Sequence, residues 1–168
     1  VLDSLLSGAS SLNMFGGGIS NKTSRLYRAL VEKEITVNAG AGAQATIDPY
    51  LYSFTMITRP ERTPDEALAA LDAEIERVQN ELVSTDEVAR AVKQARALFA
   101  YGSESITNQG FWLGYAEMFA DYDWFLTYLD KLAAVTPADV QRVAQKYLRP
   151  QARVIGTYLP VNGEMEND

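Results

Sequence analysis

Helix-start signals recur along this 168-residue chain and restrict the folds that it can adopt. Thr63-Pro64 combines an N-cap hydroxyl with a first-turn proline, and Glu66 completes a capping box. Ser84 and Glu87 form a second capping box, and Thr136-Pro137 starts a further helix. Each signal is followed by apolar residues at steps of three and four, which predicts a chain rich in amphipathic helices.

A short extended region interrupts the predicted helices. Residues 36–44 are mostly small, as in a strand that other backbone approaches closely. In residues 50–58, Tyr52, Phe54 and Met56 point to one side and the intervening residues to the other. The two segments are predicted to form an antiparallel pair whose aromatic face lies under helices. The expected helices cover residues 1–6, 22–34, 64–82, 84–99, 106–120, 122–134 and 137–148.

The remaining segments are predicted to be a loop, a last strand and a tail. Residues 9–21 contain three consecutive glycines but lack the Lys-Ser/Thr of a phosphate-binding P-loop, so a surface loop is expected. Residues 153–159 are predicted to form a closing strand, because Pro150 ends the last helix. The expected fold class is α+β, an antiparallel sheet with helices packed on it. One domain is expected over residues 1–160, followed by an acidic tail at 161–168.

The chain contains no histidine and no cysteine, which excludes most metal and nucleophilic chemistry. Catalytic zinc relies on imidazole or thiolate ligands, so no zinc site and no catalytic residue is expected in this chain. Nucleophiles activated by histidine are excluded for the same reason. Carboxylate pairs such as Asp72 and Glu76 remain, but they fall on the polar side of a predicted helix. Simple solvation of these charges is expected there.

A formal net charge of −7 argues against negatively charged partners. Nucleic acids and anionic membranes both require a basic footprint, so neither is an expected partner. No apolar run approaches the roughly 20 residues that a membrane span needs. The acidic composition fits a bacterial cytoplasm or periplasm equally well, and the compartment is left open.

Two sequence features are candidates for binding. Arg25 and Arg28 flank Tyr27 and are placed to hold a carboxylate or a peptide carbonyl, with an ordinary surface ion pair as the alternative. An aromatic cluster covers residues 111–128, and part of it follows helical spacing. The tryptophans at 112 and 124 do not both fit that spacing, so the cluster is expected to divide between core packing and a surface for a partner or substrate.

Several motifs follow one another in an order found in a known family. They comprise the glycines at 16–18, the helix with Ser24, Arg25, Leu26, Tyr27, Leu30, Glu32 and Lys33, the two strands, the Thr63-Pro64 helix, and residues 132–140 and 147–150. In this order they resemble the pitrilysin/insulinase-type zinc metallopeptidases, whose zinc motif is an inverted H-x-x-E-H. The resemblance covers essentially the whole chain.

The resemblance implies a role beside a catalytic partner region. Such peptidases are built from homologous α+β domains, and the N-terminal domain carries the zinc. Without histidine, this chain resembles the C-terminal, zinc-free domain, which closes the chamber around an extended peptide. The implied partners are the N-terminal catalytic domain of the same protein and a peptide substrate. A non-catalytic scaffold subunit of the same family is the alternative.

The resemblance also implies substrate-contacting positions. Some family members carry an Arg, and a Tyr seven residues later, that contact the substrate near the scissile bond. These positions fall on Val31 and Asn38 here, so both side chains depart from the pattern. Arg28, one helical turn earlier, is a candidate replacement, and the candidate substrate-binding residues are therefore Arg28, Asn38 and Arg25. The edge of the strand at residues 37–42 is a further candidate, because an extended peptide could add a strand there.

The family domain normally begins with strands that precede the helix found at the start of this chain. We therefore expect the chain to be part of a longer protein, with a sheet truncated at its N-terminal strands. An unprotected sheet edge pairs readily with another chain, which predicts a homodimer or a larger assembly.

Overall fold

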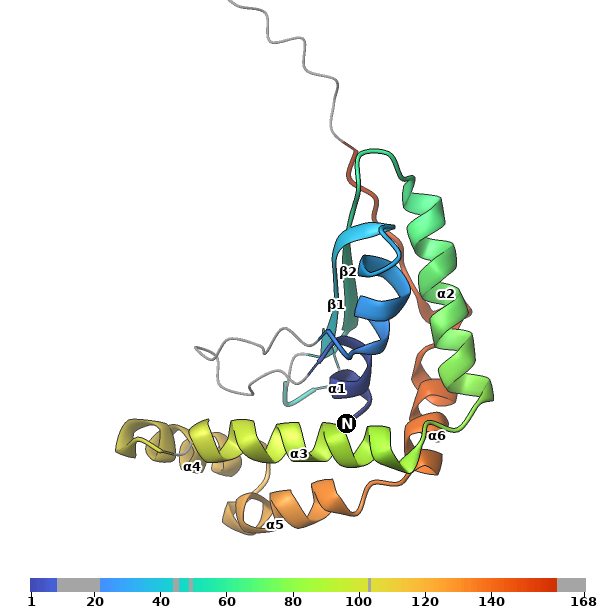
Figure 1. The fold of residues 1–168 in the computed structure, drawn as a ribbon. Helices are drawn as coiled ribbons and strands as arrows, with labels where there is room; N and C mark the ends of the chain where they lie inside the picture. The colour runs from blue at the N-terminus through green and yellow to red at the C-terminus, as the bar shows by residue number, and fades with distance from the viewer. Residues whose placement is uncertain (9–21, 44–45, 49, 103, 160–168) are drawn as a thin grey trace, which may run out of the picture.

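The computed structural model describes residues 1–8, 22–43, 46–48, 50–102 and 104–159. Helices predominate and a two-stranded sheet lies among them, so the α+β class is confirmed. The elements are α1 (Leu2–Ser7), η1 (Tyr27–Val31), β1 (Thr36–Ala43), β2 (Tyr52–Thr58), α2 (Pro64–Asn80), α3 (Thr85–Gly102), α4 (Ile106–Phe119), α5 (Tyr122–Ala133), α6 (Pro137–Tyr147) and η2 (Pro150–Ala152). Figure 1 shows α2 and α6 beside the sheet, while α3, α4 and α5 form an arm that extends away from it.

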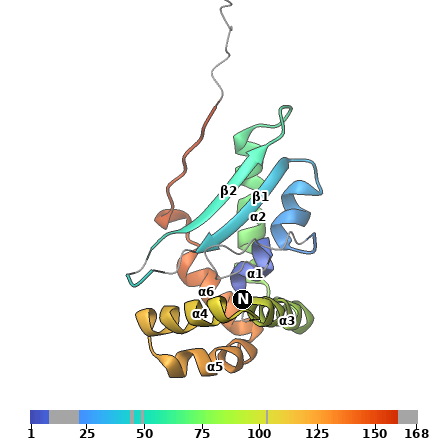
Figure 2. The same ribbon diagram turned by 90° about the vertical axis from the view of Figure 1, so that its left-hand side faces the viewer.

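The antiparallel pair of β1 and β2 supplies one wall of the core. Ala39 faces Met56 and Ala41 faces Phe54 across the ladder, and these side chains pack against the buried cluster. The antiparallel pairing is as predicted, but the close approach of other backbone to β1 is not found among the described residues: a Cβ atom at Gly40 would meet nothing within 4 Å, and one at Gly42 only the Asp3 carboxylate at 4.0 Å. A β-bulge between Thr36 and Asn38 adds one residue to β1. Figure 2 shows the two strands lying across α2.

Three capping boxes fix the starts of α2, α3 and α6. Thr63 accepts a hydrogen bond from the Glu66 amide, and the Glu66 carboxylate accepts one from the Thr63 amide. The same reciprocal bonds join Ser84 with Glu87, and Thr136 with Asp139. Each box satisfies two amides that would otherwise lack partners at a helix start. All three helix starts were predicted correctly.

The helix before β1 is shorter than predicted, and part of it is a π-helical turn. Regular helix begins at Arg25 instead of residue 22, and Tyr27–Val31 is a π-turn in which the Glu32 amide bonds the Tyr27 carbonyl. It ends in a Schellman motif, since the Ile35 amide donates to the Leu30 carbonyl and the Glu34 amide to the Val31 carbonyl. Glu34 takes the left-handed conformation, with φ of 56°, that glycine usually occupies there.

The prediction of a closing strand at residues 153–159 is wrong. This segment is extended but belongs to no sheet among the described residues, and its side chains are exposed. Its start is held by a helix instead, because the Arg153 guanidinium binds both carboxylate oxygens of Asp72 on α2. The ion pair joins this segment to α2, on an element other than the sheet. Asp72, which was considered for acid–base chemistry, is thereby occupied by Arg153.

Replacing Glu34 by glycine is expected to stabilise the fold. A non-glycine residue in the left-handed region costs about 1 kcal/mol, and the Glu34 ion pair with Arg59 is long, at 3.9 Å, and exposed. Glu34→Gly should therefore raise the free energy of unfolding by about 1 kcal/mol in urea titrations. Lys33→Gly is the control. It introduces glycine one residue earlier, where φ is negative, and should lower stability.

The capping boxes predict how acid weakens the fold. Hydrogen bonds from Thr136, aided by Arg142, lower the pKa of Asp139 from 3.8 to about 2. As the pH falls, the Asp139 carboxylate is therefore protonated in the unfolded chain before it is protonated in the folded chain. The stability that ionised Asp139 contributes is complete above pH 3.8 and is lost as the pH falls towards 2. In urea titrations at neutral pH, Asp139→Asn should have a lower free energy of unfolding than the unmodified chain. The difference in free energy of unfolding between the two should become smaller as the pH falls from 3.8 to 2. A difference that stays constant with pH would contradict this assignment.

Candidate functional site

Arg25 lies at the centre of a partly buried ion-pair network. Its guanidinium donates to the Glu74 carboxylate on α2 at 2.9 Å and contacts Glu87 on α3 at 3.0 Å. Arg77 binds the other Glu74 oxygen at 2.8 Å. Burial lowers the pKa of Arg25, but its bonds to Glu74 and Glu87 outweigh burial and raise that pKa overall. Arg25 is thus engaged in an ion-pair network that is partly buried, whereas the alternative considered for it was an ion pair on the surface.

Arg28 and Asn38 lie on the surface and take no part in this network. Arg28 is exposed on η1 and has no ion-pair partner within the described parts of the chain. Asn38 is exposed at the bulge of β1, opposite Ile57. Val31, to which the resemblance assigns the arginine position of some family members, is half-buried at the end of η1. The structure therefore leaves two of the three candidate side chains available to a ligand.

The candidate edge of β1 is partly occupied. Ser7 of α1 donates a hydrogen bond to the Ala41 carbonyl at 2.7 Å, so that carbonyl is already bonded. Val37 and Asn38, at the other end of the candidate edge, are exposed. Any strand that an extended peptide adds to β1 is thereby restricted to the end near the bulge.

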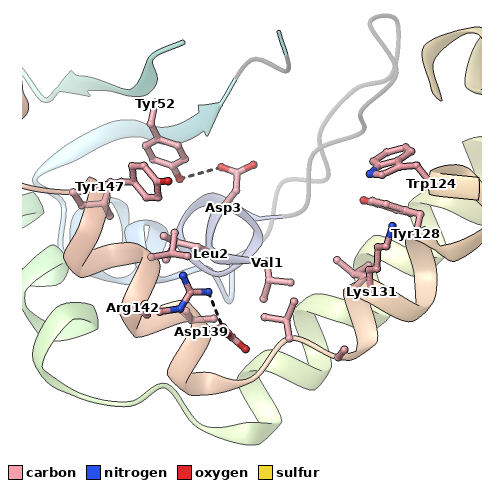
Figure 3. A pocket seen from close by; sticks show the side chains of 16 residues that line it. Val1, Leu2, Asp3, Tyr52, Trp124, Tyr128, Lys131, Asp139, Arg142 and Tyr147 are labelled. Atoms are coloured by element: carbon pink, nitrogen blue, oxygen red, sulfur yellow. Dashed lines mark hydrogen bonds and ion pairs between the residues drawn. The ribbon is translucent and has the colours of Figure 1, made fainter. Parts of the chain in front are cut away.

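A pocket of about 710 Å³ lies away from these residues, between α1, β2, α5 and α6. In Figure 3, Tyr52 and Tyr147 stand on one side, and Trp124, Tyr128 and Lys131 on the other, with the start of α1 between them. None of the three candidate residues lines this pocket. Its volume falls in the range of small-ligand sites, and its lining is mainly apolar and aromatic.

Several polar groups of the pocket already have partners. The Tyr52 hydroxyl donates to Asp3 at 3.1 Å, and burial together with the Asp3 charge raises the pKa of Tyr52. Asp139 binds Arg142 at 3.1 Å and also belongs to the capping box of α6. Tyr52 therefore stays protonated at ordinary pH, and Asp139 stays ionised. The pocket is suited to apolar contact.

The aromatic cluster divides between core and surface as expected. Trp112 is buried and packs against Phe99, with ring centroids 5.3 Å apart. Trp124 and Tyr128, whose centroids are 5.1 Å apart, line the pocket. Sequence analysis did not identify Tyr52 and Tyr147 as pocket residues, because they lie far apart in the chain.

The buried carboxylate of Glu74 was also missed. The signal was present in the sequence, since Glu74 falls three residues after Leu71 and four before Val78, on the apolar stripe of α2. A carboxylate on such a stripe needs cationic partners. Arg25, already marked as a candidate, was the residue to pair with it.

The donor chemistry of the chain does not fit a catalytic zinc ion. The sequence has no His or Cys, and the described residues contain no group of three or more Asp or Glu placed to hold a metal. Within the same residues, no helix is both long and apolar enough to cross a membrane.

Comparisons with solved structures return related folds. The chain matches a crystal structure of a protein assigned as a zinc protease from Bordetella pertussis Tohama I, with 25% identity and a TM-score of 0.76, over 95% of this chain and 82% of that one. It also matches the inactive peptidase domain of an assigned zinc protease from Bordetella parapertussis, with 24% identity and a TM-score of 0.74, over 97% and 82% of the two chains. A protease from Helicobacter pylori shares the fold, with 19% identity and a TM-score of 0.74 over 88% of this chain, which spans 33% of that protein.

A comparison with curated proteins found no match. The sequence pattern of the peptidase M16 inactive domain matches residues 1–95, more than half of the chain. This match and the structural neighbours confirm the resemblance to the zinc-free, C-terminal domain of the pitrilysin/insulinase-type peptidases. The chain belongs to the peptidase M16 inactive domain family.

Proposed function

We propose that this chain is the substrate-enclosing, non-catalytic half of a zinc endopeptidase, and that a separate N-terminal region holds the zinc. The observation that carries the proposal is the match of residues 1–95 to a domain described as inactive. The lack of histidine and cysteine supports it, because the chain cannot supply the usual ligands of catalytic zinc. When bound in the other half, zinc would supply an activated water for attack on the peptide carbonyl.

The contribution of this chain would be to hold the peptide. Arg28 presents a guanidinium that is exposed and has no ion-pair partner among the described residues, so it can donate charge-assisted hydrogen bonds to a peptide carbonyl or a carboxylate. Asn38 offers an amide at the exposed end of β1, where backbone pairing with an extended peptide is still open. Both side chains would bind and orient the peptide.

A scaffold subunit is the second candidate function. Val31 and Asn38 stand where some relatives carry the substrate-contacting Arg and Tyr, and Val31 cannot donate a hydrogen bond. A domain that has lost both groups suits a partner whose role is to support another subunit.

Mixing experiments would separate the two functions. The chain and the zinc-bearing half of its parent would be purified separately, their zinc content measured, and the cleavage of unfolded casein followed for each alone and for the mixture. The enclosing role predicts zinc in the other half only, and chelator-sensitive cleavage that requires both. Zinc and cleavage in neither would favour the scaffold role, and full activity without this chain would refute the enclosing role.

Two arginine substitutions form a matched pair for the site itself. Arg28→Gln removes an exposed cation with no internal partner, so stability should stay unchanged while kcat/KM of the mixture falls roughly tenfold. Arg25→Gln leaves one oxygen of the buried Glu74 carboxylate without its cation, and should lower the free energy of unfolding by about 2 kcal/mol. Urea titration and casein cleavage measure both variants. Unchanged cleavage with Arg28→Gln would remove Arg28 from the substrate site.

A further inference from the structure

The pocket between α1, β2, α5 and α6 contains two hydrogen-bond donors that the fold does not use. Tyr128 and Lys131 both line it, and they lie three residues apart on α5, on the same side of that helix. Figure 3 shows the two side chains together at one side of the pocket, with the Tyr128 hydroxyl directed into the open space. Among the described residues, neither the hydroxyl nor the ammonium group has a hydrogen-bond or ion-pair partner.

Aromatic neighbours hold the Tyr128 ring in place. Its centroid lies 5.1 Å from that of Trp124, which also lines the pocket, and 5.5 Å from that of Phe99 on α3. Burial, with a smaller contribution from Tyr115, raises the pKa of Tyr128, so the hydroxyl stays protonated and remains a donor at ordinary pH. The pocket therefore presents a fixed neutral donor, with a lysine cation one helical turn away on the same helix.

The acidic groups of the lining, in contrast, are already bonded. Asp3 accepts a hydrogen bond from the Tyr52 hydroxyl, and Asp139 pairs with Arg142 and caps α6. Figure 3 shows both of these bonds on the side of the pocket away from Lys131. Because Lys131 lacks a counter-ion among the described residues while the acids have partners, the pocket favours an anionic ligand over a cationic one.

We propose that this pocket binds an alkyl carboxylate, a small acid with one unbranched apolar chain. Its carboxylate accepts hydrogen bonds from the Tyr128 hydroxyl and the Lys131 ammonium group, since a carboxylate has two oxygens and can accept from both donors at once. The alkyl chain extends from there across the pocket, over the start of α1, towards Leu2 and Tyr147.

The apolar part of the lining determines the rest of the ligand. The pocket, of about 710 Å³, is walled along this path by the aliphatic side chains of Leu2, Val135, Val140 and Val143. A peptide C-terminus is the other common source of a carboxylate, but its amide groups would lose free energy if they were buried here without partners. An alkyl chain carries no such groups, so an alkyl acid fits this lining better than a peptide.

This site is separate from the proposed substrate-binding residues. Neither Arg28 nor Asn38 lines the pocket. Binding of an acid is measured on this chain alone, without a protease assay, so the proposal stands or falls independently of the proposed function.

Isothermal titration calorimetry of the whole chain with octanoate tests the proposal. Octanoate should bind with a dissociation constant below about 1 mM, because the pocket buries the alkyl chain as well as pairing the charge. Octanol has the same chain and no charge, and should bind roughly fivefold more weakly. The absence of octanoate binding at millimolar concentrations, or tighter binding of octylamine than of octanoate, would overturn the proposal. A peptide with a free carboxylate, acetyl-Ala-Ala-Leu, should bind more weakly than octanoate, and tighter binding of this peptide would overturn the assignment of an alkyl acid.

Substitutions at the two donors locate the carboxylate. Lys131→Gln and Tyr128→Phe should each raise the dissociation constant for octanoate about fivefold, and Lys131→Gln should leave that for octanol unchanged. Lys93→Gln is the matched control, because Lys93 is an exposed lysine of α3 outside the lining, and it should change neither constant. Circular dichroism would verify the folding of all three variants. An equal loss of octanoate and octanol binding in Lys131→Gln, or octanoate binding that neither donor substitution weakens, would overturn the proposal.

Discussion

The buried carboxylate of Glu74 is the constraint on which the arrangement of the helices depends. Its side chain is 4% exposed, and a carboxylate at such a depth requires compensating charge. Arg77 provides one cation from α2 itself, and Arg25 provides the second from the segment before β1. Because Arg25 also binds Glu87, the residue that completes the capping box of α3, one guanidinium joins three parts of the chain.

A second polar junction fixes the last helix on the same scaffold. The side-chain amide of Gln79 donates to the carbonyls of Ala144 and Leu148, at 3.3 and 2.6 Å. The side chains of Gln141 and Gln145 donate in return to the Gln79 carbonyl. The end of α6 and the end of α2 thereby satisfy each other's backbone groups. The apolar core supplies the attraction between these helices, and the two polar junctions determine which helix lies where.

Local signals were sufficient to predict most elements of the fold. Hydroxyl, proline and acidic residues at the helix starts act within a single turn, so the sequence predicts α2, α3 and α6 accurately. The strand pair followed from alternation in Tyr52, Phe54 and Met56. The prediction of a closing strand was wrong, and the contact that Arg153 makes with Asp72, 81 positions away, is not visible in the local sequence. The pocket was also missed, since Tyr52 and Trp124 line the same pocket only in the folded chain. Of the candidate site residues, sequence reasoning predicted where Arg28 and Asn38 lie but not that Arg25 is enclosed by two carboxylates.

The bulge in β1 has a consequence for comparing this domain with its relatives. Thr36 faces Thr58 and Asn38 faces Ile57, so Val37 is an additional residue that the ladder does not need. A relative without this additional residue would keep the same strand pairing after the bulge. Every residue number of its strand, counted from the end of η1, would then be smaller by one. Counting seven residues along the chain from Val31 leads to Asn38. Superposing β1 on a strand without the bulge would instead place either Val37 or Asn38 at the position of the relative's tyrosine. The place of the gap in a sequence alignment of this strand therefore determines which residue, Val37 or Asn38, is aligned with a relative's tyrosine. Superposition of the two backbones is the measurement that identifies the equivalent residue.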